Sequence, residues 1–354
     1  MTYFKRYFTY RLRTTAFRTL IISIIAAVLS NAITSSSGSR TGVDSGFEII
    51  GIFIGIAAVL FPMLETYQLK QRRTLDLVFA LPVTKAQLAL AHFLSGLCQM
   101  LAVSLVTCIS TMVAIMAKNA DVIKAGNTPF AVGWIIPYFL VAFLGGVCFY
   151  SITTFLFSQG NTVGDGLVFT FGVPGGFYLI TYYIGELLAD YYALDQKIED
   201  ALGGIIINLS NCFLLLSEPG VYFQDFIEPG RFDYSNRSYT GYKPMSRVEI
   251  ITCVLWVIFA VAAFFGYIWY QKNYRAERAG GISDSFFGYR VLIPLYGCIL
   301  ILMNGSGIDL LFLTFVLVAM AVAYFVYRRS FRIKYADIAC IVFAFLMVFT
   351  GGVL

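Results

Sequence analysis

Long apolar runs alternate with short polar segments along the whole chain, and this pattern predicts membrane-spanning helices of ~20 residues each. The predicted spans are 18–34, 47–67, 88–116, 133–157, 167–188, 250–270, 291–304, 308–327 and 335–354. The seventh and eighth runs are short and lie on either side of a Gly-Ser-Gly turn, so a hairpin that enters the membrane only partway is an alternative there. We therefore predict an all-α integral membrane protein, a polytopic helix bundle with six core spans plus about three additional C-terminal spans.

Residues 1–17 show a different pattern, with an apolar and a basic face at helical spacing. Tyr3, Phe4, Tyr7, Phe8 and Leu12 fall on one face, and Lys5, Arg6, Thr9 and Arg13 fall on another. This favours an N-terminal interfacial helix that lies along the membrane before the first span. The alternative is a cleaved signal peptide, but an aromatic, amphipathic start is not typical of one.

Composition and charge agree with a membrane protein and give it an orientation. Hydrophobic residues make up 59% of the 354 residues and charged residues only 13%, about half the share found in soluble domains. With the N-terminus in the cytoplasm, cytoplasmic segments hold 17 of the 25 lysines and arginines but only 6 of the 20 acidic residues. We expect a multi-pass protein of the cytoplasmic membrane, with residues 189–247 outside. The basic residues are dispersed, which argues against nucleic acid as a partner.

Candidate chemistry is sparse. No metal-ligand spacing, C-x-x-C pair or catalytic constellation occurs in the sequence. The single histidine, His92, has no cysteine or carboxylate at ligand spacing, so we assign it a packing or interfacial role. No carboxylate lies at the middle of a predicted span, which argues against a proton-driven carrier. Glu65 ends the second span, where it could pair with Arg72, Arg73 or a basic residue of the interfacial helix.

The segment from Glu65 to Lys85 is the most informative part of the chain. Residues 72–80 predict a short amphipathic helix, and Leu81-Pro82-Val83-Thr84-Lys85 predicts a turn that stops this helix before the third span. The helix could simply rest on lipid head groups, with its basic residues acting only as an orientation signal. A helix kept in such a loop also suggests that a partner docks there.

In order and spacing, Glu65, residues 72–80 and the Leu-Pro-Val-Thr-Lys turn resemble the membrane subunit of ABC transporters of the type-2 exporter class. The likeness covers residues 1–272 and implies a six-span permease domain over 18–272, with an extracellular segment at about 189–247. It also implies that a coupling helix at about 72–80 docks on a separate ATPase subunit. The implied ATPase-coupling residues are Glu65, Arg72, Arg73, Asp76, Phe79, Leu81, Pro82 and Lys85.

The resemblance also implies what this chain does not carry itself. No G-x-x-x-x-G-K-[ST] loop occurs, so we expect no enzyme activity and no cofactor on this chain, with ATP and magnesium on the partner ATPase. A second permease copy or a related permease would complete a homo- or heterodimer. Residues 273–354 resemble a Firmicutes-type branch with extra C-terminal spans. A secondary, ion-coupled carrier and a non-transporting sensor or assembly protein remain the alternative functions, and the substrate is not indicated.

Glycines suggest one further feature, in the fifth predicted span. Gly172 and Gly176 are spaced for close helix packing, and Pro174 lies between them beside Gly175. A proline in a helix removes a backbone hydrogen bond and commonly produces a kink. These four residues are therefore either a possible hinge or a fixed feature of the helix shape.

Overall fold

The computed structural model describes most of the helical part of the chain. The described residues are 2–36, 43–71, 80–118, 120, 135–192, 232–233, 238–239, 247–281, 283, 285, 288–303, 310–328, 335, 338–339 and 342. The chain divides into two compact units. Unit 1 consists of Met1–Glu65, Pro82–Thr154 and Phe213–Ile268, and unit 2 consists of Thr66–Leu81, Phe155–Cys212 and Trp269–Leu354.

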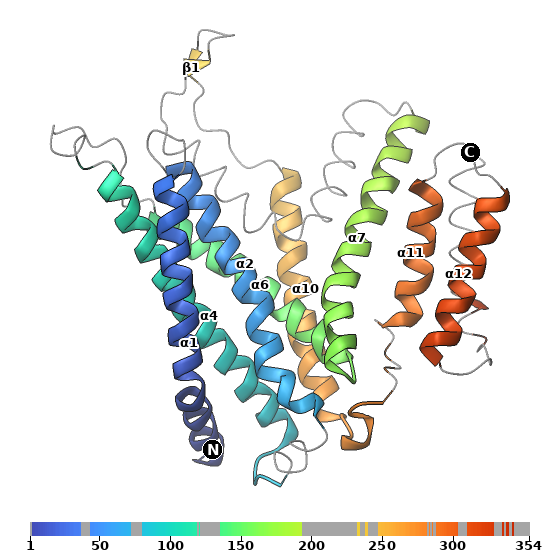
Figure 1. Ribbon diagram of the computed structural model, residues 1–354, viewed down its shortest axis with the longest axis horizontal. Coiled ribbons are helices and arrows are strands. Elements are labelled where there is room, and N and C mark those ends of the chain that lie inside the picture. The colour runs from blue at the N-terminus through green and yellow to red at the C-terminus, as the bar shows by residue number, and fades with distance from the viewer. Residues whose placement is uncertain are drawn as a thin grey trace. The chain divides into compact units, whose positions relative to one another are not determined.

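Almost all described elements are helices (Figure 1). They are α1 (Thr2–Ser36), α2 (Val43–Thr66), the 3-10 helix η1 (Tyr67–Lys70), α4 (Lys85–Lys118), α6 (Ile135–Gln159), α7 (Val163–Tyr192), α10 (Arg247–Lys272), the 3-10 helix η3 (Ala276–Arg278), α11 (Tyr289–Met303) and α12 (Leu310–Arg328). Two two-residue strands, β1 (Phe232–Asp233) and β2 (Ser238–Tyr239), pair antiparallel.

Six helices in the described part of the chain are long and apolar enough to cross a membrane, which indicates a multi-pass membrane protein. Their candidate spans are Tyr3–Ser36, Glu48–Lys70, Lys85–Lys118, Tyr138–Gln159, Val163–Ile180 and Cys253–Lys272. Each overlaps one of the six predicted core spans, so that prediction is confirmed at the level of six apolar helices.

The remaining span predictions have different outcomes. The predicted interfacial helix and the first span form one uninterrupted helix, α1, and an interfacial position for residues 2–17 stays a prediction. The seventh and eighth runs form the helices α11 and α12, whose apolar stretches, Tyr289–Ile301 and Leu311–Tyr327, are shorter than the six candidate spans. Most of the ninth run, 335–354, and most of 189–247 lie outside the described residues. The predicted domain boundaries at 17 and 272 also stay predictions.

Buried hydrogen bonds tie together the helices of unit 1. The Thr153 hydroxyl of α6 donates to the Ala58 carbonyl of α2 at 2.7 Å, and the Tyr150 hydroxyl donates to the Phe93 carbonyl of α4 at 2.9 Å. Further along α4, the Ser110 hydroxyl donates to the Ala27 carbonyl of α1 at 2.8 Å. Such bonds between helices satisfy polar groups where water is absent, and they fix how the helices pack.

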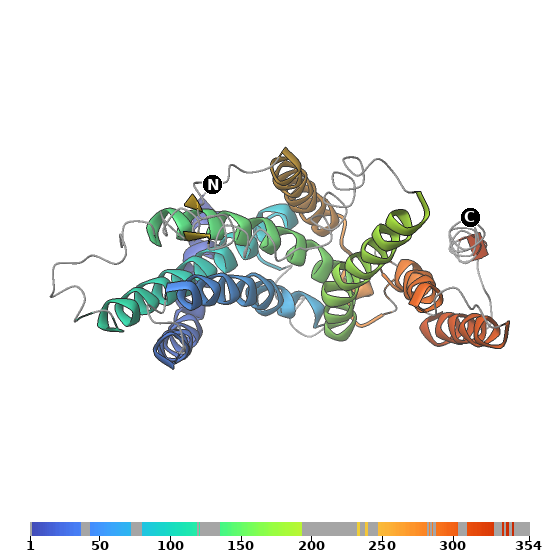
Figure 2. The ribbon, with the colours of Figure 1, turned by 90° about the horizontal axis from the view of Figure 1, so that it is seen from above.

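The helix α1 exposes apolar side chains along its length. α1 lies at the edge of unit 1 (Figure 2), and the exposed positions Phe17, Leu20, Ile24 and Val28 recur at helical spacing along it. Each of these four side chains is more than half exposed. A continuous apolar stripe of this kind would be unfavourable in water and is expected where a helix contacts acyl chains.

Unit 2 is built around α11. This helix packs against α7 on one side and α12 on the other (Figure 1). Between α11 and α12, four buried residues form a hydrophobic cluster: Cys298 and Ile301 of α11, and Val316 and Met320 of α12. α11 is thus the central contact of the C-terminal helices.

Candidate functional site

A buried ionic cluster surrounds Glu65 at the end of α2. The Glu65 side chain is 1% exposed, and its two carboxylate oxygens accept hydrogen bonds from two arginines of α1. Arg11 Nη2 lies 2.7 Å from Oε2, and Arg18 Nη2 lies 2.6 Å from Oε1. The Arg11 side chain is also buried, whereas that of Arg18 is 31% exposed. The prediction that Glu65 pairs with a basic residue of the N-terminal segment is therefore confirmed for Arg11.

Two polar residues of α4 complete the cluster. Gln99 donates from Nε2 to Glu65 Oε1 at 2.7 Å, and its Oε1 accepts from Arg18 Nη2 at 2.7 Å, so one amide binds both ions. His92 Nδ1 lies 3.2 Å from Arg11 Nη2 and 3.6 Å from Glu65 Oε2. The expectation that His92 has no carboxylate nearby is wrong, because helix packing brings together residues far apart in sequence.

The tautomer of His92 follows from its neighbours. A guanidinium can only donate hydrogen bonds, so His92 accepts from Arg11 at Nδ1 and carries its proton on Nε2. Nε2 lies 3.1 Å from the Tyr7 hydroxyl, to which it then donates. The Tyr7 ring also meets the His92 ring edge to face, with centroids 6.0 Å apart. His92 therefore extends the cluster one turn further along α1.

Electrostatics make this cluster a rigid junction of three helices. Moving an ion out of water costs several kcal/mol, which only close opposite charges and hydrogen bonds can offset. Glu65 has such partners from α1 and α4, so each helix holds the others in place. Two arginines face one carboxylate in the described part of the cluster, and the partial exposure of Arg18 lets water solvate the surplus positive charge.

The sequence contained a signal for this cluster that our reading did not use. Tyr7, Arg11 and Arg18 are spaced by four and seven residues and so share one face of α1. His92 and Gln99, seven residues apart, share one face of α4 in the same way. Polar faces at matching ends of two apolar helices indicate a shared buried partner. Arg11, Arg18 and Gln99 could have been proposed from this pattern.

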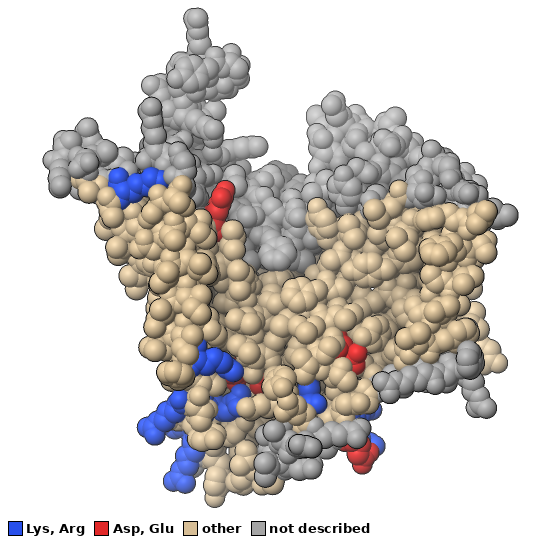
Figure 3. Space-filling model, viewed as in Figure 1, with Lys and Arg blue, Asp and Glu red and all other residues tan. Residues whose placement is uncertain are grey.

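The same end of unit 1 gathers basic side chains. Figure 3 shows lysine and arginine side chains collected where α1 begins, at the end where Glu65 of α2 and His92 of α4 also lie. Positive charge at one end of apolar helices is the pattern that sets membrane orientation. The cytoplasmic placement of this end stays a prediction.

The segment that connects α2 to α4 is anchored at both of its ends. α4 begins at Lys85, the last residue of the predicted turn and three residues before the predicted third span at 88–116, and the helix start is a capping box. The Thr84 hydroxyl accepts from the Gln87 amide, and Gln87 Oε1 accepts from the Thr84 amide, both at 3.3 Å. Leu81, Pro82 and Lys85 are exposed around this turn. Arg72, Arg73, Asp76 and Phe79 lie outside the described residues, so the coupling helix itself stays a prediction.

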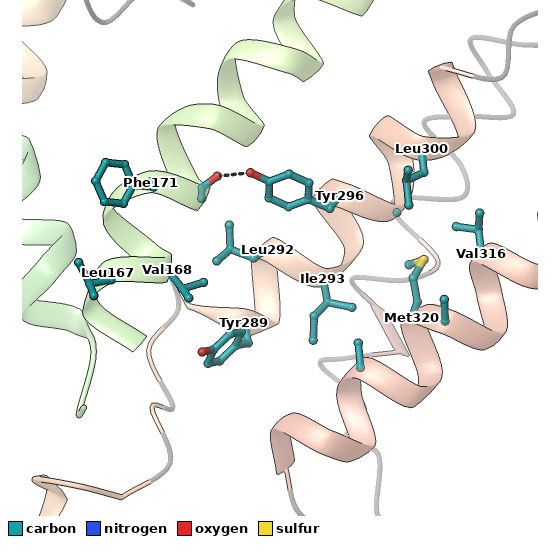
Figure 4. A pocket seen from close by; sticks show the side chains of 14 residues that line it. Leu167, Val168, Phe171, Tyr289, Leu292, Ile293, Tyr296, Leu300, Val316 and Met320 are labelled. Atoms are coloured by element: carbon teal, nitrogen blue, oxygen red, sulfur yellow. Dashed lines mark hydrogen bonds between the residues drawn. The ribbon is translucent and has the colours of Figure 1, made fainter. Parts of the chain in front are cut away.

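The predicted hinge glycines form part of a helix contact. The Tyr296 hydroxyl of α11 donates to the Gly172 carbonyl of α7 at 3.0 Å (Figure 4). A Cβ at Gly176 would collide with the Leu295 side chain, so this glycine allows α11 to approach closely. α7 runs through Pro174 and Gly175 as one helix. Close packing at Gly172 and Gly176 is confirmed, and a hinge at these four residues stays a prediction.

An apolar groove of about 690 Å³ lies beside this contact (Figure 4). Residues of α7, α11 and α12 line it, with Leu292, Val316 and Met320 buried at its walls. Its two tyrosines, Tyr289 and Tyr296, already donate their hydroxyl protons within the chain. The groove therefore offers mainly dispersion contacts to anything that enters it.

Metal-binding chemistry and known relatives add no further assignment. Among the residues that the structure describes, no group of three His, Cys, Asp or Glu side chains is arranged to hold a metal ion. No family model, curated protein or solved structure matches this chain.

Proposed function

We propose that this chain is the permease subunit of an ATP-binding cassette exporter of the type-2 class, driven by a separate ATPase subunit. The observation that carries the proposal is the Glu65 cluster, because it makes a rigid junction where the segment connecting α2 to α4 departs. A segment that transmits the movement of a docked protein to the membrane helices must be fixed where it joins them. The buried ion cluster around Glu65 fixes that point.

The far end of the connecting segment supports the same reading. The Thr84–Gln87 capping box fixes the start of α4, so residues between 66 and 84 are held at both ends. The amphipathic pattern of residues 72–80 and the Leu-Pro-Val-Thr-Lys turn then provide the docking helix, by resemblance to type-2 permeases. In this proposal the segment and the N-terminus face the cytoplasm, in the cytoplasmic membrane.

The energy source would be ATP hydrolysis on the partner. ATP and magnesium would bind the ATPase subunit, and a second permease, identical or related, would complete the transporter. The work of this chain is conformational: displacement of the docking helix changes the packing of α2 and α4, to which it is covalently joined. The substrate route would lie among the spans.

Affinity purification from native membranes tests this proposal. A tagged form of the chain should co-purify with a protein that contains a phosphate-binding G-x-x-x-x-G-K-[ST] loop. Reversing charge with Arg72→Glu and Arg73→Glu should release that protein by adding repulsion to lost contacts. The matched control is Lys5→Glu with Arg6→Glu, which reverses a basic pair that is exposed near the start of α1.

The outcomes separate the candidate functions. Loss of the ATPase in the Arg72/Arg73 variant alone, with normal membrane insertion, supports the proposal. Recovery of no ATPase from native membranes would remove it in favour of a carrier or a non-transporting protein. In vesicles that hold both subunits, a catalytically inactive ATPase should abolish export, whereas a protonophore should not while ATP is supplied.

A further inference from the structure

A second buried polar cluster, within unit 2, has no role in the proposal above. It begins with Lys70, the last residue of η1, whose side chain is buried. Lys70 Nζ donates to the Gly160 carbonyl in the α6–α7 turn and lies 4.6 Å from the Phe157 ring centroid. The carboxylate of Asp165 interacts with its charge. A buried ammonium is retained only where such partners offset its desolvation.

The α6–α7 turn that receives Lys70 is closely packed. A Cβ at Gly160 would collide with the backbone nitrogen of Gly166, and a Cβ at Gly166 would lie 2.9 Å from the Phe157 ring. Thr162 caps α7 by accepting from the Asp165 amide at 3.1 Å. Because the turn is so closely packed, it is expected to move as a rigid unit, and a displacement of Gly160 also displaces the start of α7.

Ser283 links this turn to the C-terminal helices. Its side chain is 1% exposed, and its hydroxyl accepts from the Asn161 amide at 2.7 Å and donates to Asp165 Oδ2 at 2.6 Å. The Ser283 carbonyl accepts from the Tyr327 hydroxyl of α12 at 2.7 Å. Asp165 Oδ1 accepts from the Tyr289 hydroxyl, at the start of α11, at 2.8 Å.

The backbone next to Ser283 strengthens the same link. The Gly280 amide donates to the Asn161 carbonyl at 2.9 Å, and Gly280 has a positive φ of 73°, which suits glycine. The Ser285 hydroxyl donates to Gln159 Oε1 at 2.7 Å. Gly280, Ser283 and Ser285 thus contact the α6–α7 turn between Gln159 and Asp165.

Through Lys70, these contacts bind η1 to unit 2, although nearly all of α2, which precedes η1, belongs to unit 1. We propose that Lys70 and Ser283 are positioning residues of one latch, which joins the segment after α2 to α7, α11 and α12. The latch consists of Lys70, Gly160, Asn161, Asp165 and Ser283. A displacement of residues 66–81 is then passed to the C-terminal helices, while Glu65 holds the preceding residue of the chain in unit 1.

Hydrogen exchange of the purified full chain tests the latch without any partner. Lys70→Met removes the ammonium and keeps an apolar stem of similar length. Amide exchange should accelerate by about tenfold, the ratio expected for loss of one buried hydrogen bond, at 66–71 and also at residues 279–292. Lys272→Met, which alters an exposed lysine at the end of α10, should change neither segment.

Reciprocity makes the test sharper, because coupling between two sites must act in both directions. Ser283→Ala removes only a hydroxyl, and it should accelerate exchange at 66–71, which Ser283 does not touch in any described contact. If Lys70→Met does not fold, Ser283→Ala tests the latch by the same exchange measurement. Acceleration confined to the segment around each substitution would overturn the latch.

The latch depends on the proposed function in one respect only, namely that a docked ATPase displaces residues 66–81. If no ATPase binds the chain, reciprocal exchange between residues 66–71 and 279–292 still supports the latch. If an ATPase binds but the exchange effects stay local, the latch is wrong and the proposed function stands.

Discussion

Neutralising Glu65 is the most direct test of the ionic junction in unit 1. Glu65→Gln keeps the size of the side chain and some of its hydrogen bonds but removes the only negative charge among the described members of the cluster. Arg11, which is buried, and Arg18, which is 31% exposed, then lose the carboxylate to which both donate. Removing one partner of a buried ion pair costs about 3–5 kcal/mol.

The measurement is thermal unfolding of the detergent-solubilised chain. At roughly 2 °C per kcal/mol for a large chain, a loss of this size lowers the unfolding midpoint by about 6–10 °C. Glu48→Gln is the matched control, because Glu48 lies on the same helix and is exposed. Its substitution should change the midpoint by no more than about 1 °C, as expected for a surface position.

A double variant tests whether Glu65 and Arg11 stabilise the chain through each other. Glu65→Gln combined with Arg11→Met removes both members of the ion pair, so the double variant should be less destabilised than the sum of the two single variants. Equal midpoints for Glu65→Gln and Glu48→Gln would refute the view that Glu65 holds α1, α2 and α4 together. Additive losses in the double variant would show that Glu65 and Arg11 act independently.

Three further predictions concern other parts of the chain. Gly160→Ala should destabilise the chain by about 1–3 kcal/mol in thermal unfolding, because a methyl group there would collide with the backbone of Gly166. Gly164→Ala is the matched control, because a Cβ there would meet the Thr162 hydroxyl at an ordinary contact distance of 3.9 Å, and it should be neutral or stabilising by up to about 1 kcal/mol. Thr84→Ala should cost about 1 kcal/mol by removing the cap of α4, measured in the same way. In intact cells of a strain carrying an otherwise cysteine-free chain, a membrane-impermeant thiol reagent should label a cysteine at Ser235 but not one at Thr74, and the opposite result would reverse the orientation.

The connecting segment shows how far local sequence patterns can be read. The start of α4 at Lys85 was predictable because Pro82 cannot continue a helix and because Thr84 and Gln87 have the spacing of a capping box, a contact between near neighbours. The spans were predictable for a similar reason, since ~20 consecutive apolar residues are enough to favour a membrane helix whatever its neighbours are.

The partners of the buried charges needed the fold. Glu65 lies 54 residues from Arg11 and 34 from Gln99, and Lys70 lies 90 residues from Gly160. Helical spacing shows which residues share a face, but it does not say which two faces meet, because many helix pairings bury similar apolar area. His92 was therefore assigned a packing role until the packing of α4 against α1 and α2 placed it beside Glu65 and Arg11.

The sequence by itself thus determined the class of protein, the six apolar helices, the start of α4 and the basic character of the N-terminal end, all of which follow from composition and contacts within about four residues. Only the tertiary structure decided that Glu65 joins α1 and α4 and that residues 66–81 group with the C-terminal helices. The physical reason is desolvation: a buried charge must find its counterion or hydrogen-bond partners wherever the packing of distant helices places them.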